Sequence, residues 1–103
     1  MPNEFLQEVY ELEKVNDVHV ALDLVFNKID ALFTEGKFKE VDDILDAIDL
    51  SRLSTSLMRG FLTITWAGKK HLNNRVKFLA SVRKAMIKIR GEEITDKILK
   101  EMD

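Results

Sequence analysis

The chain of 103 residues is long enough for one hydrophobic core, and its 46% hydrophobic and 33% charged residues with a net charge of −2 are typical of a globular protein. It has no cysteine, which excludes disulfides, thiolate nucleophiles and cysteine-based zinc sites. Its longest uncharged apolar stretch, residues 60–68, is far shorter than the ~20 residues of a membrane span, and Glu4, Glu8 and Glu11 are unlike a secretory leader. We therefore expect one cytoplasmic helical domain over residues 1–103, with no membrane partner.

The first half of the chain predicts three helices. Pro2 suits a helix start, and the short charged segment 1–15 is expected to be a loosely docked N-terminal arm. Residues 18–34 place their apolar side chains on one face at 100° per residue, and Gly36 follows where a left-handed residue ends a helix. A third helix begins at Phe38. Because the link at residues 36–37 is so short, these two helices should form an antiparallel αα-hairpin.

The second half predicts two or three more helices. Ser54 can cap a helix that is apolar over most of its circumference, although β-branched residues in 61–66 also suit a strand, for which the chain offers no partner. A long helix should run from Asn73 or Asn74 to Arg90, followed by a short one over 95–102. The fold class is therefore all-α, a compact bundle of five to six helices that contains an αα-hairpin. Its core should consist of Leu22, Val25, Phe26, Ile29, Leu45, Ile48, Leu57, Phe61, Leu62, Phe78, Val82 and Met86.

Two stretches resemble known helical proteins. Gly36 followed by Phe38, Val41 and Leu45 makes the hairpin 30–48 similar to half of a tetratricopeptide repeat. The acidic hairpin, then Leu53-Ser54-Thr55-Ser56-Leu57, then a basic helix, resembles small uncharacterised helical proteins of bacterial and phage genomes. That second resemblance implies a bacterial, phage or prophage source and no particular activity.

Charge is divided sharply along the chain. Residues 51–91 hold ten Lys and Arg and no acid, whereas residues 1–50 hold thirteen acids and four Lys. At 100° per residue, Lys77, Lys84 and Lys88 form one stripe of the long helix and Arg83 and Arg90 a second. The free amides at the start of that helix also favour phosphate. We predict a binding surface, the basic face, made of Lys69, Lys70, Arg75, Lys77, Arg83, Lys84, Lys88 and Arg90.

The third helix carries an outward acidic face of Asp42, Asp43 and Asp46. These acids can pair with the basic stripes inside one molecule or across a dimer, or they can bind a partner of opposite charge. A single helix face without a glycine loop or histidine supplies metal ligands poorly, so no metal site is expected.

Catalytic chemistry has little support in the sequence. His19 and His71 are the two histidines, and Ser51, Ser54 and Ser56 cluster where a helix begins. The chain has no phosphate-binding glycine loop, no zinc-protease motif and no nucleophile elbow. We expect no enzyme, no catalytic residue and no cofactor.

The leading hypothesis is a non-enzymatic protein-protein interaction module, or small regulator, that acts through charge-complementary helical surfaces. The partner is another protein or a second copy of the chain, and a homodimer is as expected as a monomer. The alternative is a nucleic-acid-binding regulator that uses the basic segment 69–90.

Overall fold

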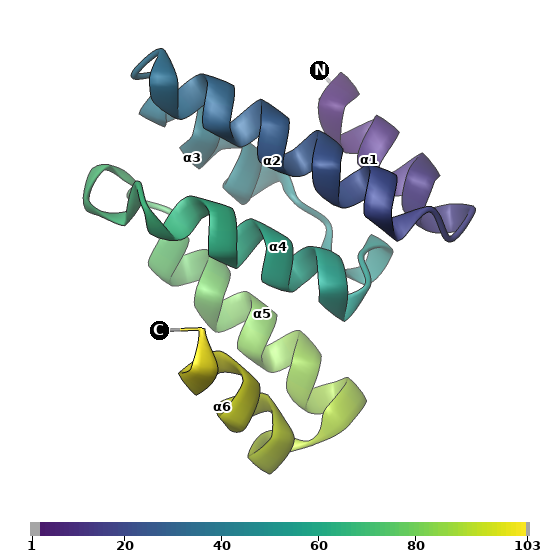
Figure 1. The fold of residues 1–103 in the computed structure, drawn as a ribbon. Helices are drawn as coiled ribbons and strands as arrows, with labels where there is room; N and C mark the ends of the chain where they lie inside the picture. Colours follow the sequence, from purple (N-terminus) through teal and green to yellow (C-terminus); the bar gives the residue numbers. More distant parts are fainter. Residues whose placement is uncertain (1–2, 103) are drawn as a thin grey trace.

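The structure, a computed structural model, describes residues 3–102, and this range contains helices and no strand (Figure 1). The elements are α1 (Glu4–Lys14), α2 (Val18–Thr34), α3 (Phe38–Ala47), η1 (Leu50–Arg52), α4 (Thr55–Trp66), η2 (Lys69–His71), α5 (Arg75–Arg90) and α6 (Glu92–Glu101), where η marks a short 3₁₀ helix. The all-α prediction with its αα-hairpin, α2–α3, is confirmed. Pro2, expected to start the first helix, lies outside the described residues, and Asn3 caps α1 by accepting the Leu6 amide.

Helix caps and turns predicted from short stretches of sequence mark the ends of several helices. Gly36 has φ +72°, and the amide of Lys37 bonds to the carbonyl of Leu32 at 2.8 Å, which closes α2 in a Schellman motif. Asn16 adopts φ +61° and ends α1 in the same way. The Ser54 hydroxyl accepts the amide of Leu57, so Ser54 is the N-cap of α4. The segment 61–66 is therefore helix and not strand.

The core is built around α4, which lies between α2 and α5 (Figure 1). Phe61 is fully buried, and its ring meets the rings of Phe5 and Phe78 edge-on. The buried side chains confirm most of the predicted core: Val25, Ile29, Leu45, Leu57, Phe61, Leu62, Phe78, Val82 and Met86. Leu22 and Ile48 are half-buried, and Phe26 is exposed at 36% of its surface, because it lies at the edge of the contact between α2 and α4.

The expectation of a loosely docked arm over residues 1–15 is corrected by the position of α1. Leu6, Val9 and Tyr10 are all buried in the core cluster. The Tyr10 hydroxyl also accepts the amide of Asp49 at 2.9 Å, which ties α1 to the segment after α3. Most charged side chains of α1 lie on its outer side. The high charge of the segment therefore did not indicate weak docking.

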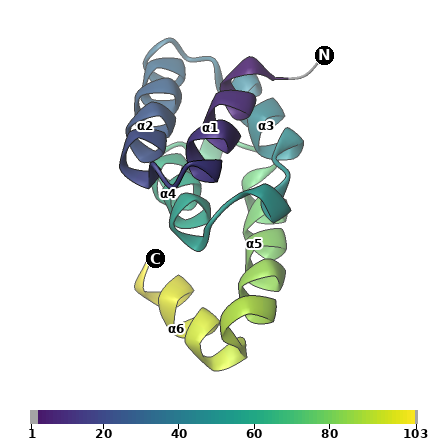
Figure 2. The ribbon, with the colours of Figure 1, turned by 90° about the vertical axis from the view of Figure 1, so that its right-hand side faces the viewer.

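The far end of α5 projects beyond the other helices and carries α6 beside it (Figure 2). Gly91, with φ +85°, turns the chain so that α6 packs back against α5. Thr95 is fully buried in α6, and α6 starts at Glu92, three residues before the predicted start. No helix within residues 3–102 combines the length and the hydropathy that crossing a bilayer requires.

Candidate interaction surfaces

Asp42 is not part of an exposed acidic face, which corrects the outward position expected for it. Its side chain is buried, and its two carboxylate oxygens accept the backbone amides of Asn73 and Asn74 at 2.9 Å each. The Asn74 side-chain amide donates in return to the backbone carbonyl of Asp42. Asp42 therefore joins α3 to the start of α5. Because its carboxylate already lies at that helix N-terminus, a phosphate there would meet a like charge.

Arg75, predicted to be part of the basic face, is also bonded within the molecule. Its guanidinium donates to the carbonyl of Leu62 at 2.8 Å and to the hydroxyl of Thr65 at 3.2 Å. Both acceptors belong to the last two turns of α4, where the helix dipole favours a cation. Thr65 is itself fully buried and donates to the carbonyl of Phe61. Arg75 is thus a structural residue that holds α5 against the end of α4.

The two other acids of the predicted acidic face, Asp43 and Asp46, are paired within the molecule. Asp46 lies 3.2 Å from the ammonium of Lys77 in α5, and Asp43 lies 3.1 Å from that of Lys39, one turn earlier on α3. All four side chains are more than half exposed, so each pair contributes little to stability. The pairs nevertheless neutralise the acidic face predicted from Asp43 and Asp46.

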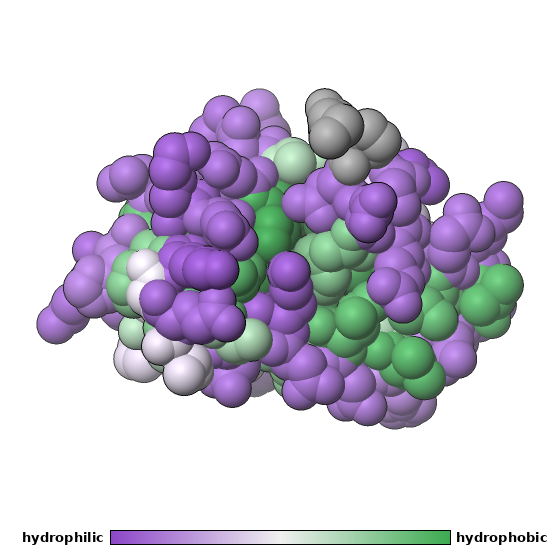
Figure 3. All heavy atoms as spheres, turned by 90° about the horizontal axis from the view of Figure 1, so that it is seen from above, coloured by the Kyte–Doolittle hydropathy of each residue, from purple (hydrophilic) through white to green (hydrophobic). Residues whose placement is uncertain are grey.

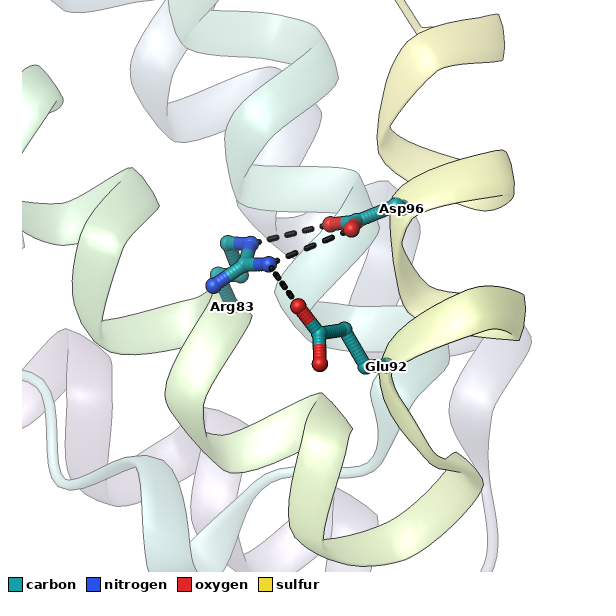
Figure 4. A network of polar contacts seen from close by, with 3 residues as sticks. All are labelled: Arg83, Glu92 and Asp96. Atoms are coloured by element: carbon teal, nitrogen blue, oxygen red, sulfur yellow. Dashed lines mark hydrogen bonds and ion pairs between the residues drawn. The ribbon is translucent and has the colours of Figure 1, made fainter.

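Arg83 is engaged by α6 (Figure 4). It forms a two-point contact with Asp96, with nitrogen–oxygen distances of 2.9 and 3.2 Å, and reaches Glu92 at 3.3 Å. The hydrogen bond from Arg83 holds the pKa of Asp96 below its usual range, and the same contact raises the pKa of Arg83. In the second predicted stripe of α5, Arg83 is therefore paired with acids of α6.

Arg90, from the same stripe, donates to the hydroxyl of Thr55 at 3.3 Å. The other members of the basic face are exposed: Lys69, Lys70, Lys84 and Lys88. None of these four lysines forms an ion pair with any residue between 3 and 102. The Lys69 ammonium lies 4.2 Å from the centre of the Trp66 ring, a cation–π contact. The basic-face lysines without an ion pair thus lie in two places. Lys69 and Lys70 are in η2, and Lys84 and Lys88 are near the end of α5.

Three functional candidates were not singled out from the sequence. Arg59 is exposed on α4 and has no partner among the described residues. Trp66 is 43% exposed at the end of α4, and Ile89 is 63% exposed beside Lys88, near the end of α5. Helical periodicity alone does not show their exposure, because exposure depends on where the neighbouring helices lie.

The acidic surface lies on α1 and α2 instead of α3. Figure 3 looks onto these two helices and shows a mainly hydrophilic face, with apolar side chains near its centre and toward its right-hand end. Val15 and Val20 are among the exposed apolar residues of the chain. The exposed acids of the two helices are Glu4, Glu8, Glu11, Asp23 and Asp30. The exposed acids of α1 and α2 thus lie on two helices at the upper end of the view in Figure 1, whereas α4, η2 and α5 carry cations and no acid, and α6 beside α5 carries acids again.

The two histidines do not share a site with acids. The ring of His71 is stacked on Phe38 with centres 4.4 Å apart, and His19 is exposed on α2. In the part of the chain that the structure describes, no three His, Asp or Glu residues gather in a way that could hold a metal ion.

Comparison with known proteins identifies no relative: no family model matches the chain, and neither a curated protein nor a solved structure shows significant similarity. The class that the fold and surfaces define is a small all-α protein with acidic and cationic sides.

Proposed function

We propose that this protein is a non-enzymatic interaction module that binds an acidic surface of a partner protein through the projecting end of α5. The observation that carries the proposal is the position of Lys84 and Lys88. Both are exposed on one side of α5, one turn apart, and neither has an acidic partner within residues 3–102. Their charge is therefore free to meet an acidic surface.

The surroundings of these lysines favour a protein over a nucleic acid. Ile89 follows Lys88 directly, and Ile94 is 52% exposed at the start of α6. A protein interface combines an apolar centre with a charged rim, whereas a phosphate backbone offers nothing for exposed isoleucines. The cations that would extend the surface along α5, namely Arg75, Lys77 and Arg83, are engaged inside the molecule.

A second copy of the chain is one candidate for this partner. The acids on α1 and α2 are complementary in charge to Lys84 and Lys88, and a contact between these two different surfaces would be head-to-tail. Association of that kind weakens as salt rises, because exposed charges are screened. Sedimentation equilibrium at 20 and 500 mM salt separates self-association from a monomer. The cytoplasmic location and the phage or prophage source remain part of this proposal.

Affinity capture from extracts of the cells that naturally produce the protein tests the proposal. The paired substitution Lys84→Glu with Lys88→Glu should abolish capture of a defined partner, and Ile89→Asp should weaken it by more than tenfold. The matched control, Lys14→Glu with Lys28→Glu, changes the net charge equally on α1 and α2 and should leave capture of any partner other than a second copy unchanged. Equal capture by all variants, or equal loss in the control, would overturn the assignment of α5.

A further inference from the structure

A second exposed strip, separate from the lysines at the end of α5, combines cations with an aromatic ring. Trp66 is the last residue of α4 and the only tryptophan of the chain. Lys69 covers part of its ring, and Lys70 follows with an exposed, unpaired ammonium. Arg59 lies seven residues before Trp66, which places it on the same side of the helix about 10 Å away along the axis. We call Arg59, Trp66, Lys69 and Lys70 the α4–η2 strip.

The backbone of this strip is held firmly by aromatic packing beneath it. A Cβ atom at Gly68 would lie 2.6 Å from the ring of Phe33, so the chain passes directly over that ring. The Phe33 and Phe38 rings are 5.6 Å apart, and His71 is stacked on the far side of Phe38. This arrangement anchors η2 on both sides of its lysines. Lys69 and Lys70 are therefore presented from a fixed backbone, which lowers the entropy lost when a ligand binds.

The electrostatic surroundings leave the strip positive. Residues 51–91 contain no acid. The nearby turn between α2 and α3 contributes Glu35, which is paired with Lys37 at 3.0 Å, and α3 contributes Asp43, which is paired with Lys39 at 3.1 Å. The hydrogen bond that Lys37 donates to Glu35 also raises the pKa of Lys37, as expected for a formed pair. The charge of Arg59, Lys69 and Lys70 is therefore not cancelled by these acids.

We propose that the α4–η2 strip binds single-stranded nucleic acid, with a base stacked on Trp66 and phosphates held by Arg59, Lys69 and Lys70. An exposed aromatic ring between cations is the arrangement by which proteins hold unpaired strands without reading their sequence. A duplex keeps its bases stacked inside and cannot use the ring in this way. The strip differs in this respect from the end of α5, where the apolar neighbours are aliphatic.

The test uses the full chain and oligodeoxythymidylate of twelve nucleotides. Quenching of the single tryptophan reports binding at Trp66, and the anisotropy of a fluorescein-labelled oligonucleotide reports binding to any site. We expect saturable quenching and a slope of log K against log salt of about −2, for three phosphates on a single strand. Lys70→Ala should reduce that slope by about 0.7. A duplex of the same length should bind more weakly.

Substitutions separate this site from the rest of the surface. Trp66→Ala should weaken binding about 5- to 150-fold, and Trp66→Phe should retain part of the affinity, because a smaller ring still stacks. Lys28→Ala on the acidic α2 is the control and should change nothing. No anisotropy change at 50 mM salt with 100 μM protein would overturn the proposal. Binding that survives Trp66→Ala and is lost in the Lys84 and Lys88 variants would overturn it too, in favour of the end of α5.

Discussion

Asp42 and Asn74 form a reciprocal pair across the interior of the molecule. The carboxylate of Asp42 accepts the backbone amide of Asn74, and the side chain of Asn74 donates to the backbone carbonyl of Asp42, both at 2.9 Å. The two residues are 32 positions apart in the chain. This pair sets where α5 begins relative to α3, and it therefore positions the whole projecting hairpin of α5 and α6.

Asp42→Ala should lower the free energy of unfolding by about 2–4 kcal/mol, because it leaves two partly buried amides without their charged acceptor. Asp43→Ala is the matched control. Asp43 is exposed and paired only with Lys39, so its loss should cost less than about 0.5 kcal/mol. Urea denaturation followed by circular dichroism measures both. Similar losses for the two variants would show that Asp42 does not hold α5.

Gly68→Ala should destabilise the protein by about 1–3 kcal/mol, because the new Cβ would lie 2.6–3.1 Å from three carbons of the rigid Phe33 ring. Gly60→Ala is the comparison. Its Cβ would meet only the end of the Leu22 side chain at 2.6 Å, which can rotate away, and alanine gains about 1 kcal/mol in helix propensity. Thermal unfolding of the two variants should therefore rank Gly68→Ala as clearly less stable. The reverse order would contradict the packing of Phe33 on η2.

Thr95→Val should stabilise the protein by about 1 kcal/mol. The Thr95 hydroxyl is fully buried in α6 and has no hydrogen-bond partner among residues 3–102, so valine removes an uncompensated polar group at nearly constant volume. Thr65→Val should do the opposite and cost about 1–3 kcal/mol, because Arg75 loses an acceptor in the core. Hydrogen exchange of the α6 amides, together with urea denaturation, checks both signs.

Acid should weaken the contact between Arg83 of α5 and Asp96 of α6. Arg83 holds the pKa of Asp96 below its ordinary value in the folded protein, so this contact stabilises α6 above about pH 4 and is lost as pH falls through the lowered pKa. An NMR titration of the Asp96 carboxyl carbon should show this low pKa. Arg83→Gln should raise it to the ordinary range of an aspartate, whereas Lys97→Gln should not. An unchanged Asp96 titration in Arg83→Gln would exclude the contact in solution.

Most helices could be predicted because their signals are local. The apolar period of residues 18–34, the turn at Gly36 and the cap at Ser54 each act within a few residues, and all three are confirmed. The docking of α1 was missed, since burial of Leu6 and Val9 depends on helices that arrive later in the chain. The outward position of Asp42 was wrong for a related reason. The amides that draw it inward lie more than 30 residues away.

The candidate surface was less predictable than the fold. Spacing placed Lys84 and Lys88 on one stripe, and both are exposed and unpaired among the described residues. The same spacing could not show that Lys77 meets Asp46, because that contact depends on how α3 and α5 cross. Nor could it show that Trp66 lies under Lys69, since this requires the turn that Gly68 makes over Phe33.

By itself, the sequence determined five to six helical segments and a division of charge between the two halves of the chain, because propensity, capping and residue charge are properties of short stretches. Tertiary structure alone decided which charges remain available. Ion pairs and buried hydrogen bonds form only where helix packing brings groups within about 3 Å. That packing gave Asp42, Arg75 and Arg83 partners within the molecule, while Lys84, Lys88 and the α4–η2 strip stayed exposed.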